Sequence, residues 1–140
     1  MPWVTVDQVR LAVRSVLGLG PDARLPEFWA EPTEAGTAMG KVRVQGALAD
    51  RGFTPAQVAI WDGLGPWHRI AALYHTFAEA NLDDERTAAA LARYEELLKG
   101  LATTAVTAGG EALVPGASGG NVSHGGEDTP DRQFTRDSVL

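Results

Sequence analysis

The first part of the chain carries apolar side chains at the three- and four-residue spacing of an α-helix. They are Val6, Val9, Val13, Val16 and Leu17. Thr5 comes directly before this run, and Gln8 stands three residues after Thr5, which is the arrangement of a capping box. Gly18 and Gly20 then interrupt the pattern. The sequence therefore predicts a helix that begins after Thr5 and ends at Gly18.

Residues 21–33 contain three prolines and the adjacent aromatic residues Phe28 and Trp29. We interpret this stretch as an irregular connection, with room for a single helical turn, whose aromatic rings cover the core. A second helix is predicted for residues 34–51, with Thr33 as its cap and a glycine at its end.

Three glycines fall inside this second helix, where each costs about 1 kcal/mol relative to alanine. They are Gly36, Gly40 and Gly46. The sequence leaves two explanations open. The first two glycines, with Ala47, can let a neighbouring backbone approach closely. Alternatively, residues 40–46 form a strand, because Val42 and Val44 alternate with polar side chains. We favour the helix.

A short helical unit follows in residues 53–63. Thr54 is placed to cap it, Pro55 occupies its first position, and Gln57 completes a second capping box. The side chains predicted to face inward are Val58 and Trp61.

The strongest periodic segment runs from Pro66 to about Leu82. Its apolar stripe consists of Trp67, Ile70, Leu73, Tyr74 and Phe77. A fifth helix begins after Asp83 and Asp84, whose carboxylates favour a helix N-terminus, and ends at Gly100. Its inward positions are Ala88, Leu91, Tyr94, Leu98 and Leu101. The two helices are expected to form an antiparallel hairpin.

The pattern changes after Leu101, because residues 102–140 are rich in glycine and have no helical period. The sequence thus predicts an all-α protein with two parts. Residues 1–101 form a small helical bundle of about four to five helices, and residues 102–140 form a long irregular C-terminal arm.

The arm ends in apolar and charged side chains that are typical of a binding segment. Glycine-rich backbone loses about 1–2 kcal/mol per residue on ordering, and the arm has little apolar surface to offset that loss. We therefore expect a neighbouring chain to hold it, with the apolar side chains filling pockets and the charged ones selecting the partner. The predicted partner-binding residues are Arg132, Phe134, Arg136, Asp137, Val139 and Leu140.

Charge and composition narrow the function. The net charge of -6 repels phosphate backbones and disfavours nonspecific nucleic-acid binding. The chain has no cysteine, so disulfides and thiolate metal ligands are excluded. The N-terminus lacks a signal-peptide pattern, and no apolar run approaches the roughly 18 residues of a membrane span. We expect a soluble protein that is not exported.

The candidate chemical groups favour structural roles. His68 and His75 are two helical turns apart, about 10.8 Å of rise, which is too far to ligate one metal. His124 has no carboxylate or nucleophile beside it, and the acidic residues 83–85 are explained by helix capping. Phosphate-binding, nucleophile-elbow and zinc-protease motifs are absent from the sequence. We therefore predict a non-enzyme without cofactor or metal.

Residues 41–63 also suggest a helix-turn-helix, which gives an alternative function as a small DNA-binding regulator. Lys41, Arg43 and Arg51 supply positive charge. The second helix of this motif carries no basic side chain. It would offer Ala56, Gln57, Ala59 and Asp62 to a groove.

Four segments carry a resemblance to a known family, over roughly residues 3–101. They read "TVDQVRLAV", "LADRGFTPAQV", "RIAALYHTFAEA" and "ARYEELLKGL". In pattern and spacing the chain resembles the head-to-tail adaptor, or head completion, proteins of tailed bacteriophages.

This resemblance implies a structural virion protein that is assembled in the host cytoplasm. It would form a ring, commonly of twelve copies, between the portal and the tail or stopper proteins. DNA would pass through the channel of that ring without sequence-specific binding. The C-terminal segments of such proteins often reach the portal, which is the role implied for residues 134–140.

Overall fold

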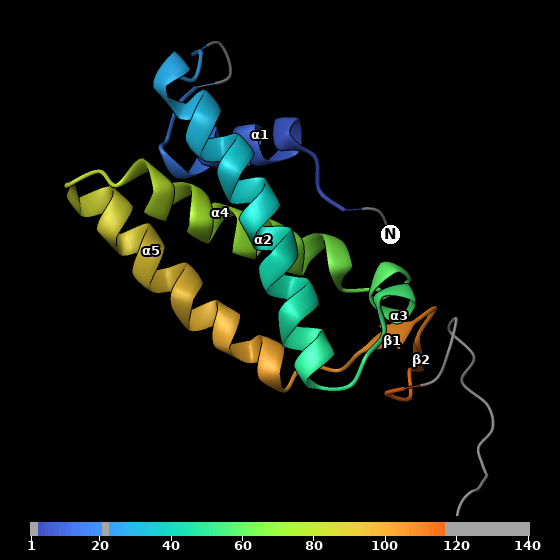
Figure 1. The fold of residues 1–140 in the computed structure, drawn as a ribbon. Coiled ribbons are helices and arrows are strands. Elements are labelled where there is room, and N and C mark those ends of the chain that lie inside the picture. Colours follow the sequence, from blue (N-terminus) through green and yellow to red (C-terminus); the bar gives the residue numbers. More distant parts are fainter. Residues whose placement is uncertain (1–2, 21–22, 117–140) are drawn as a thin grey trace, which may run out of the picture.

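The computed structural model describes residues 3–20 and 23–116 of the 140-residue chain. In that part, five α-helices, two 3₁₀ turns and one small β-hairpin build a helical bundle, which confirms the predicted all-α class (Figure 1). The elements are α1 (Val6–Val16), η1 (Glu27–Trp29), α2 (Ala30–Asp50), α3 (Pro55–Ala59), α4 (Leu64–Ala80), α5 (Glu85–Leu98), η2 (Lys99–Ala102), β1 (Thr107–Ala108) and β2 (Glu111–Ala112).

Two capping boxes start α1 and α3 where the sequence predicted them. In α1 the Gln8 N–H donates to Thr5 Oγ1 at 3.2 Å, and the Thr5 N–H donates to Gln8 Oε1 at 2.9 Å. In α3 the Gln57 N–H donates to Thr54 Oγ1 at 3.2 Å, and the Thr54 N–H donates to Gln57 Oε1 at 2.9 Å. These bonds satisfy N–H groups that a helix start leaves without intrahelical partners.

The second helix begins earlier than its predicted start. It starts at Ala30, directly after the η1 turn. Pro32 does not prevent this start, because it lies in the first helical turn, where its missing N–H costs no hydrogen bond. The prediction that Thr33 caps the helix is wrong, since its hydroxyl donates to the Trp29 carbonyl at 2.6 Å inside the helix. The strand alternative for residues 40–46 is also wrong, because they are helical.

Close approach of α2 to α4 explains two of the three helix glycines. A Cβ added at Gly36 would lie 2.5 Å from the backbone nitrogen of Thr76, and one at Gly40 would lie 2.6 Å from that of Ala72. Real Cβ atoms essentially never approach other atoms so closely. A Cβ at Gly46 would meet only open space. The first two glycines are therefore required by packing, and the third is not.

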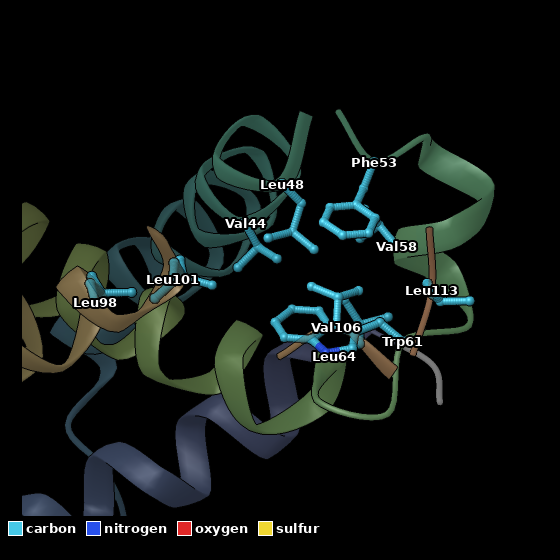
Figure 2. Close-up of a cluster of buried hydrophobic side chains, with 11 residues drawn as sticks. Val44, Leu48, Phe53, Val58, Trp61, Leu64, Leu98, Leu101, Val106 and Leu113 are labelled. Atoms are coloured by element: carbon cyan, nitrogen blue, oxygen red, sulfur yellow. The ribbon is translucent and has the colours of Figure 1, made fainter. Parts of the chain in front are cut away.

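Helix α4 is the centre of the bundle, because it packs against α1, α2 and α5 and contributes to both buried clusters. The first cluster comprises Val44, Leu48, Phe53, Val58, Trp61, Leu64, Ala71, Leu98, Leu101, Val106 and Leu113 (Figure 2). The second comprises Val9, Val13, Trp29, Ala72, Leu73, Phe77, Ala80, Ala90 and Tyr94. In the predicted stripe of α4, Trp67, Ile70 and Tyr74 are only half-buried. In α5 the inward prediction for Ala88 is wrong, because Ala88 is exposed and Ala90 is buried.

The first part of the segment assigned to the arm packs on the bundle. The sequence analysis placed the arm after Leu101, yet Val106 and Leu113 belong to the first buried cluster. The Leu113 N–H donates to the Val106 carbonyl at 2.9 Å, which closes the hairpin of β1 and β2. The described residues 102–116 therefore continue the bundle.

Asp62 holds the turn of this hairpin. Its carboxylate accepts hydrogen bonds at 2.9 Å from the N–H groups of Gly110 and Gly109 and from the hydroxyl of Thr107. Both glycines have positive φ, +59° at Gly109 and +85° at Gly110, as a tight hairpin turn requires. The hydrogen bonds from Gly110, Gly109 and Thr107 lower the pKa of the Asp62 carboxyl, because they stabilise its ionised form.

Alanine at Gly40 and at Gly46 should have opposite effects on stability. Gly40→Ala places a methyl group against the α4 backbone, so we expect the free energy of unfolding to fall by about 1–3 kcal/mol. Gly46→Ala removes only the entropic cost of glycine in a helix, so we expect a rise of about 1 kcal/mol. Urea unfolding followed by circular dichroism measures both. Equal effects of the two substitutions would contradict the close crossing.

Candidate partner interface

His68 is a buried structural histidine that ties the N-terminal segment to the bundle. The Val4 N–H donates to His68 Nδ1 at 2.9 Å, so the proton of the neutral ring is on Nε2, which donates to the Thr37 carbonyl at 2.9 Å. The Trp3 ring packs edge-on at 5.1 Å between centroids. Burial lowers the pKa of His68. The hydrogen bond to the Thr37 carbonyl acts in the opposite direction, and the positive charge of Lys41 lowers the pKa further, so that the net shift is downward.

The other candidate groups do not gather into a chemical site. His75 is half-buried, and burial followed by the nearby charge of Arg43 lowers its pKa. Within residues 3–20 and 23–116, no three His, Cys, Asp or Glu side chains are placed to hold a metal ion. No helix in those ranges is long and apolar enough to cross a membrane.

The helix-turn-helix candidate residues contact their own chain. The Arg51 guanidinium donates to the carbonyls of Leu101 and Thr104, both at 2.8 Å. Lys41 and Arg43 lie over aromatic rings of the bundle. The Gln57 side chain is buried, and its amide donates to the Val114 carbonyl, while Asp62 is held by the hairpin turn. The second helix of the motif, α3, is five residues long.

Two hollows flank the outer side of α1 and share one exposed residue. The first is lined by Trp3, Val4, Gln8, Leu11, Ala12, Gly65, Pro66 and Arg69. The second, which we name the α1 hollow, is lined by Asp7, Arg10, Leu11, Arg14, Arg24, Leu25, Pro26, Glu27 and Ala30. Leu11 lies in both linings, and 60% of its surface is exposed.

The α1 hollow has an excess of positive charge, although the chain as a whole is acidic. Its lining holds three arginines and two carboxylates. The Arg10 guanidinium pairs with Asp7 at 2.8 Å, and Arg14 donates to the Gly20 carbonyl at 2.9 Å, which fixes the direction of these side chains. Arg24 is exposed.

The other end of the molecule is formed by the end of α2, α3 and the β-hairpin, and we name it the hairpin end. Its exposed residues include Asp50, Ile60, Glu111 and Val114. The exposed fractions of the two apolar members are 43% for Ile60 and 52% for Val114. The bond from Gln57 to the Val114 carbonyl holds the chain after β2 against α3.

The partner-binding residues predicted from the sequence are all in the arm, and the structure does not test them. The predicted residues Arg132, Phe134, Arg136, Asp137, Val139 and Leu140 lie outside the described residues. For Leu11 a signal was present, because it falls on the side of α1 opposite to the buried Val9 and Val13. The hairpin end had no comparable signal.

No protein-family model matches the chain, and neither a curated protein nor a solved structure does. We therefore infer the function from the residue pattern and the geometry.

Stability should fall as the pH drops below the ordinary His pKa of about 6.5. The folded pKa of His68 is below its unfolded value, so the unfolded chain takes up the proton more readily. The contribution of neutral His68 to the free energy of unfolding is fully present above about pH 6.5, and it is lost as the pH falls toward the pKa of His68 in the folded protein.

Titration of the His68 ring by NMR tests this expectation. The measurement uses the His75→Gln variant, in which His68 is the one remaining histidine with a lowered pKa among the described residues. An apparent pKa of His68 at or above about 6.5 would contradict the buried, neutral ring.

Proposed function

We propose that this chain is a structural protein of a tailed-bacteriophage virion and serves as a head-to-tail adaptor. Copies of the chain form a ring, expected to hold twelve, between the portal and the tail or stopper proteins. DNA passes through the channel of the ring without sequence-specific binding. The protein has no catalytic role, and it is incorporated into the virion after synthesis in the host cytoplasm.

One observation carries the proposal: every segment that bears the family resemblance is part of a helix or a helix junction. Residues 5–13 cover the cap and most of α1, and residues 48–58 cover the junction of α2 and α3. Residues 69–80 lie in α4, and residues 92–101 lie in α5 and η2. The resemblance is therefore one of helical pattern, in a chain whose described part is a helical bundle.

The surfaces of the bundle also support an assembly protein. Leu11 at one end and Ile60 and Val114 at the other expose a large part of their apolar area to solvent. Protein interfaces usually combine an apolar centre with a polar rim. A ring adaptor needs such contacts with its neighbours and with the proteins above and below it.

The arm supplies a further contact in this proposal. It begins after Gly116, because Val106 and Leu113 are part of the core. Its binding residues are those proposed from the sequence: Arg132, Phe134, Arg136, Asp137, Val139 and Leu140. They dock a neighbouring chain, either the portal or another copy in the ring.

Truncation after Gly116 tests the arm separately from the bundle. We expect the shortened chain to keep its helical circular dichroism and its cooperative unfolding, because the two buried clusters remain complete. We expect it to lose assembly with the portal protein of the same genome, as judged by electron microscopy of mixed samples. The full-length chain is the control.

Binding of DNA separates the adaptor from the regulator. A full-length chain that shifts a specific DNA fragment and stays monomeric beside the portal would overturn the adaptor function in favour of the helix-turn-helix alternative.

A further inference from the structure

The first of the two hollows beside α1, which we name the Trp3 hollow, is an apolar recess between the N-terminal segment, α1 and the start of α4. Its apolar lining is formed by Trp3, Val4, Leu11, Ala12 and Pro66. Leu11 is exposed and the Trp3 ring is half-buried, so the recess presents apolar surface to solvent. Its volume is about 580 Å³, within the range of roughly 300–1,000 Å³ that is typical of binding pockets.

The charged groups at this hollow are cationic. Arg69 is the one charged side chain among the described residues of its lining, and it has neither a hydrogen bond nor an ion pair within those residues. The Lys41 ammonium lies 5.1 Å from the centroid of the Trp3 ring and adds a second positive charge beside the lining. The carboxylate of Asp7 lines the α1 hollow instead and is paired with Arg10. The Trp3 hollow therefore suits a segment that combines an aromatic side chain with carboxylates.

The arm, residues 117–140, has this composition. Its part up to Asp131 contains three carboxylates and no lysine or arginine. Phe134 follows three residues later and is the one phenylalanine, tyrosine or tryptophan of the arm. Arg132 and Arg136 lie beside Phe134, so the negative charge that complements the hollow is confined to the stretch before it.

The arm begins close to the Trp3 hollow. Asp62 binds the turn of the hairpin that precedes the arm, and His68 binds the backbone of Val4 at the hollow. The two residues are six positions apart, so at most about 20 Å separates their Cα atoms. Figure 1 shows the N-terminal segment, the start of α4 and the β-hairpin on the same side of the bundle. Phe134 is 18 residues after Gly116, and a chain of that length spans up to about 60 Å, so Phe134 reaches the hollow of its own chain.

The covalent connection favours the hollow of the same chain over that of a second copy. A segment joined to its site by a short linker has an effective concentration in the millimolar range. A second copy in a dilute sample offers its hollow at a far lower concentration. A weak contact, such as one aromatic ring with one charge pair, is therefore formed within one chain first.

We propose that the arm folds back on its own bundle and inserts Phe134 into the Trp3 hollow, with Asp131 paired to Arg69. The Phe134 ring packs against Trp3 and Leu11, where it removes apolar surface from water. This contact does not depend on the adaptor function, because it forms within the free chain.

The contact competes with the partner that the adaptor function assigns to the arm. Phe134 is one of the residues proposed to dock a neighbouring chain, and one side chain cannot occupy two sites. The apparent affinity of the arm for that neighbour is therefore reduced by the fraction of chains in which the arm is free. The hollow thus restrains the arm until a partner that binds it more tightly is present.

A spin label on the arm tests the contact in the full-length chain. The chain has no cysteine, so Ser138→Cys provides a single attachment site for a nitroxide. We expect the nitroxide to broaden the NMR signals of the Trp3 indole N–H and of the Leu11 methyl groups. Phe134→Ala should restore both signals, because it removes the side chain that fills the hollow. The methyl signals of Leu82, at the far end of α4, are the reference and should keep their intensity.

Charge reversal tests the proposed ion pair. Arg69→Glu should weaken the broadening, and Asp131→Arg in the same chain should restore it, because the two changes together bring opposite charges into contact again. Arg24→Glu reverses an exposed arginine of the neighbouring α1 hollow and is the matched control on the bundle. Val122→Ala is the control on the arm. Both controls should leave the broadening unchanged, and circular dichroism checks that every variant keeps its helices.

A mixed sample separates the same chain from a second copy. Spin-labelled copies without isotope label are mixed with isotope-labelled copies without nitroxide, and we expect no broadening in this mixture. In the chain that carries both labels, the broadening should not change on dilution. Three results would overturn the contact: intact Trp3 and Leu11 signals in the spin-labelled chain, broadening that persists in Phe134→Ala, and broadening in the mixed sample.

Discussion

The backbones of α2 and α4 meet at Gly36 and Gly40, and α1 and α5 pack against the helix pair that this crossing forms. With a side chain at either position, the backbone at Thr76 or Ala72 would have to move away. The close approach brings the small residues Ala71 and Ala72 of α4 into the interior. Helix α4 can then be covered on both sides, which gives the bundle two buried clusters around one central helix.

The crossing also fixes the two ends of α2 within the bundle. Ala30, its first residue, lines the α1 hollow, and Asp50, its last, lies at the hairpin end. The N-terminal segment is fixed to the same helix pair by His68, which joins Val4 to the Thr37 carbonyl of α2. At the other end, Asp62 holds the hairpin turn through three hydrogen bonds.

Local chemistry made much of the fold predictable. The boxes of Thr5 with Gln8 and of Thr54 with Gln57 depend only on residues three positions apart, so the sequence alone located the starts of α1 and α3. The start of α2 was missed because Thr33 has the side chain of a cap, while the η1 turn before Pro32 had already begun the helix. Ala88 was misplaced because alanine fits either face of a helix, and only the neighbouring helices decide which face is buried.

The sequence by itself determined the all-α class, the caps of α1 and α3 and the approximate limits of most helices, because these follow from spacing within a few residues. The burial of Val106 and Leu113 was decided by the tertiary structure, since their partners in α2, α3 and α4 are far away in the chain. The exposure of Leu11, Ile60 and Val114 was decided in the same way. They are ordinary apolar residues in the sequence, and they are exposed because no other part of the described bundle covers them.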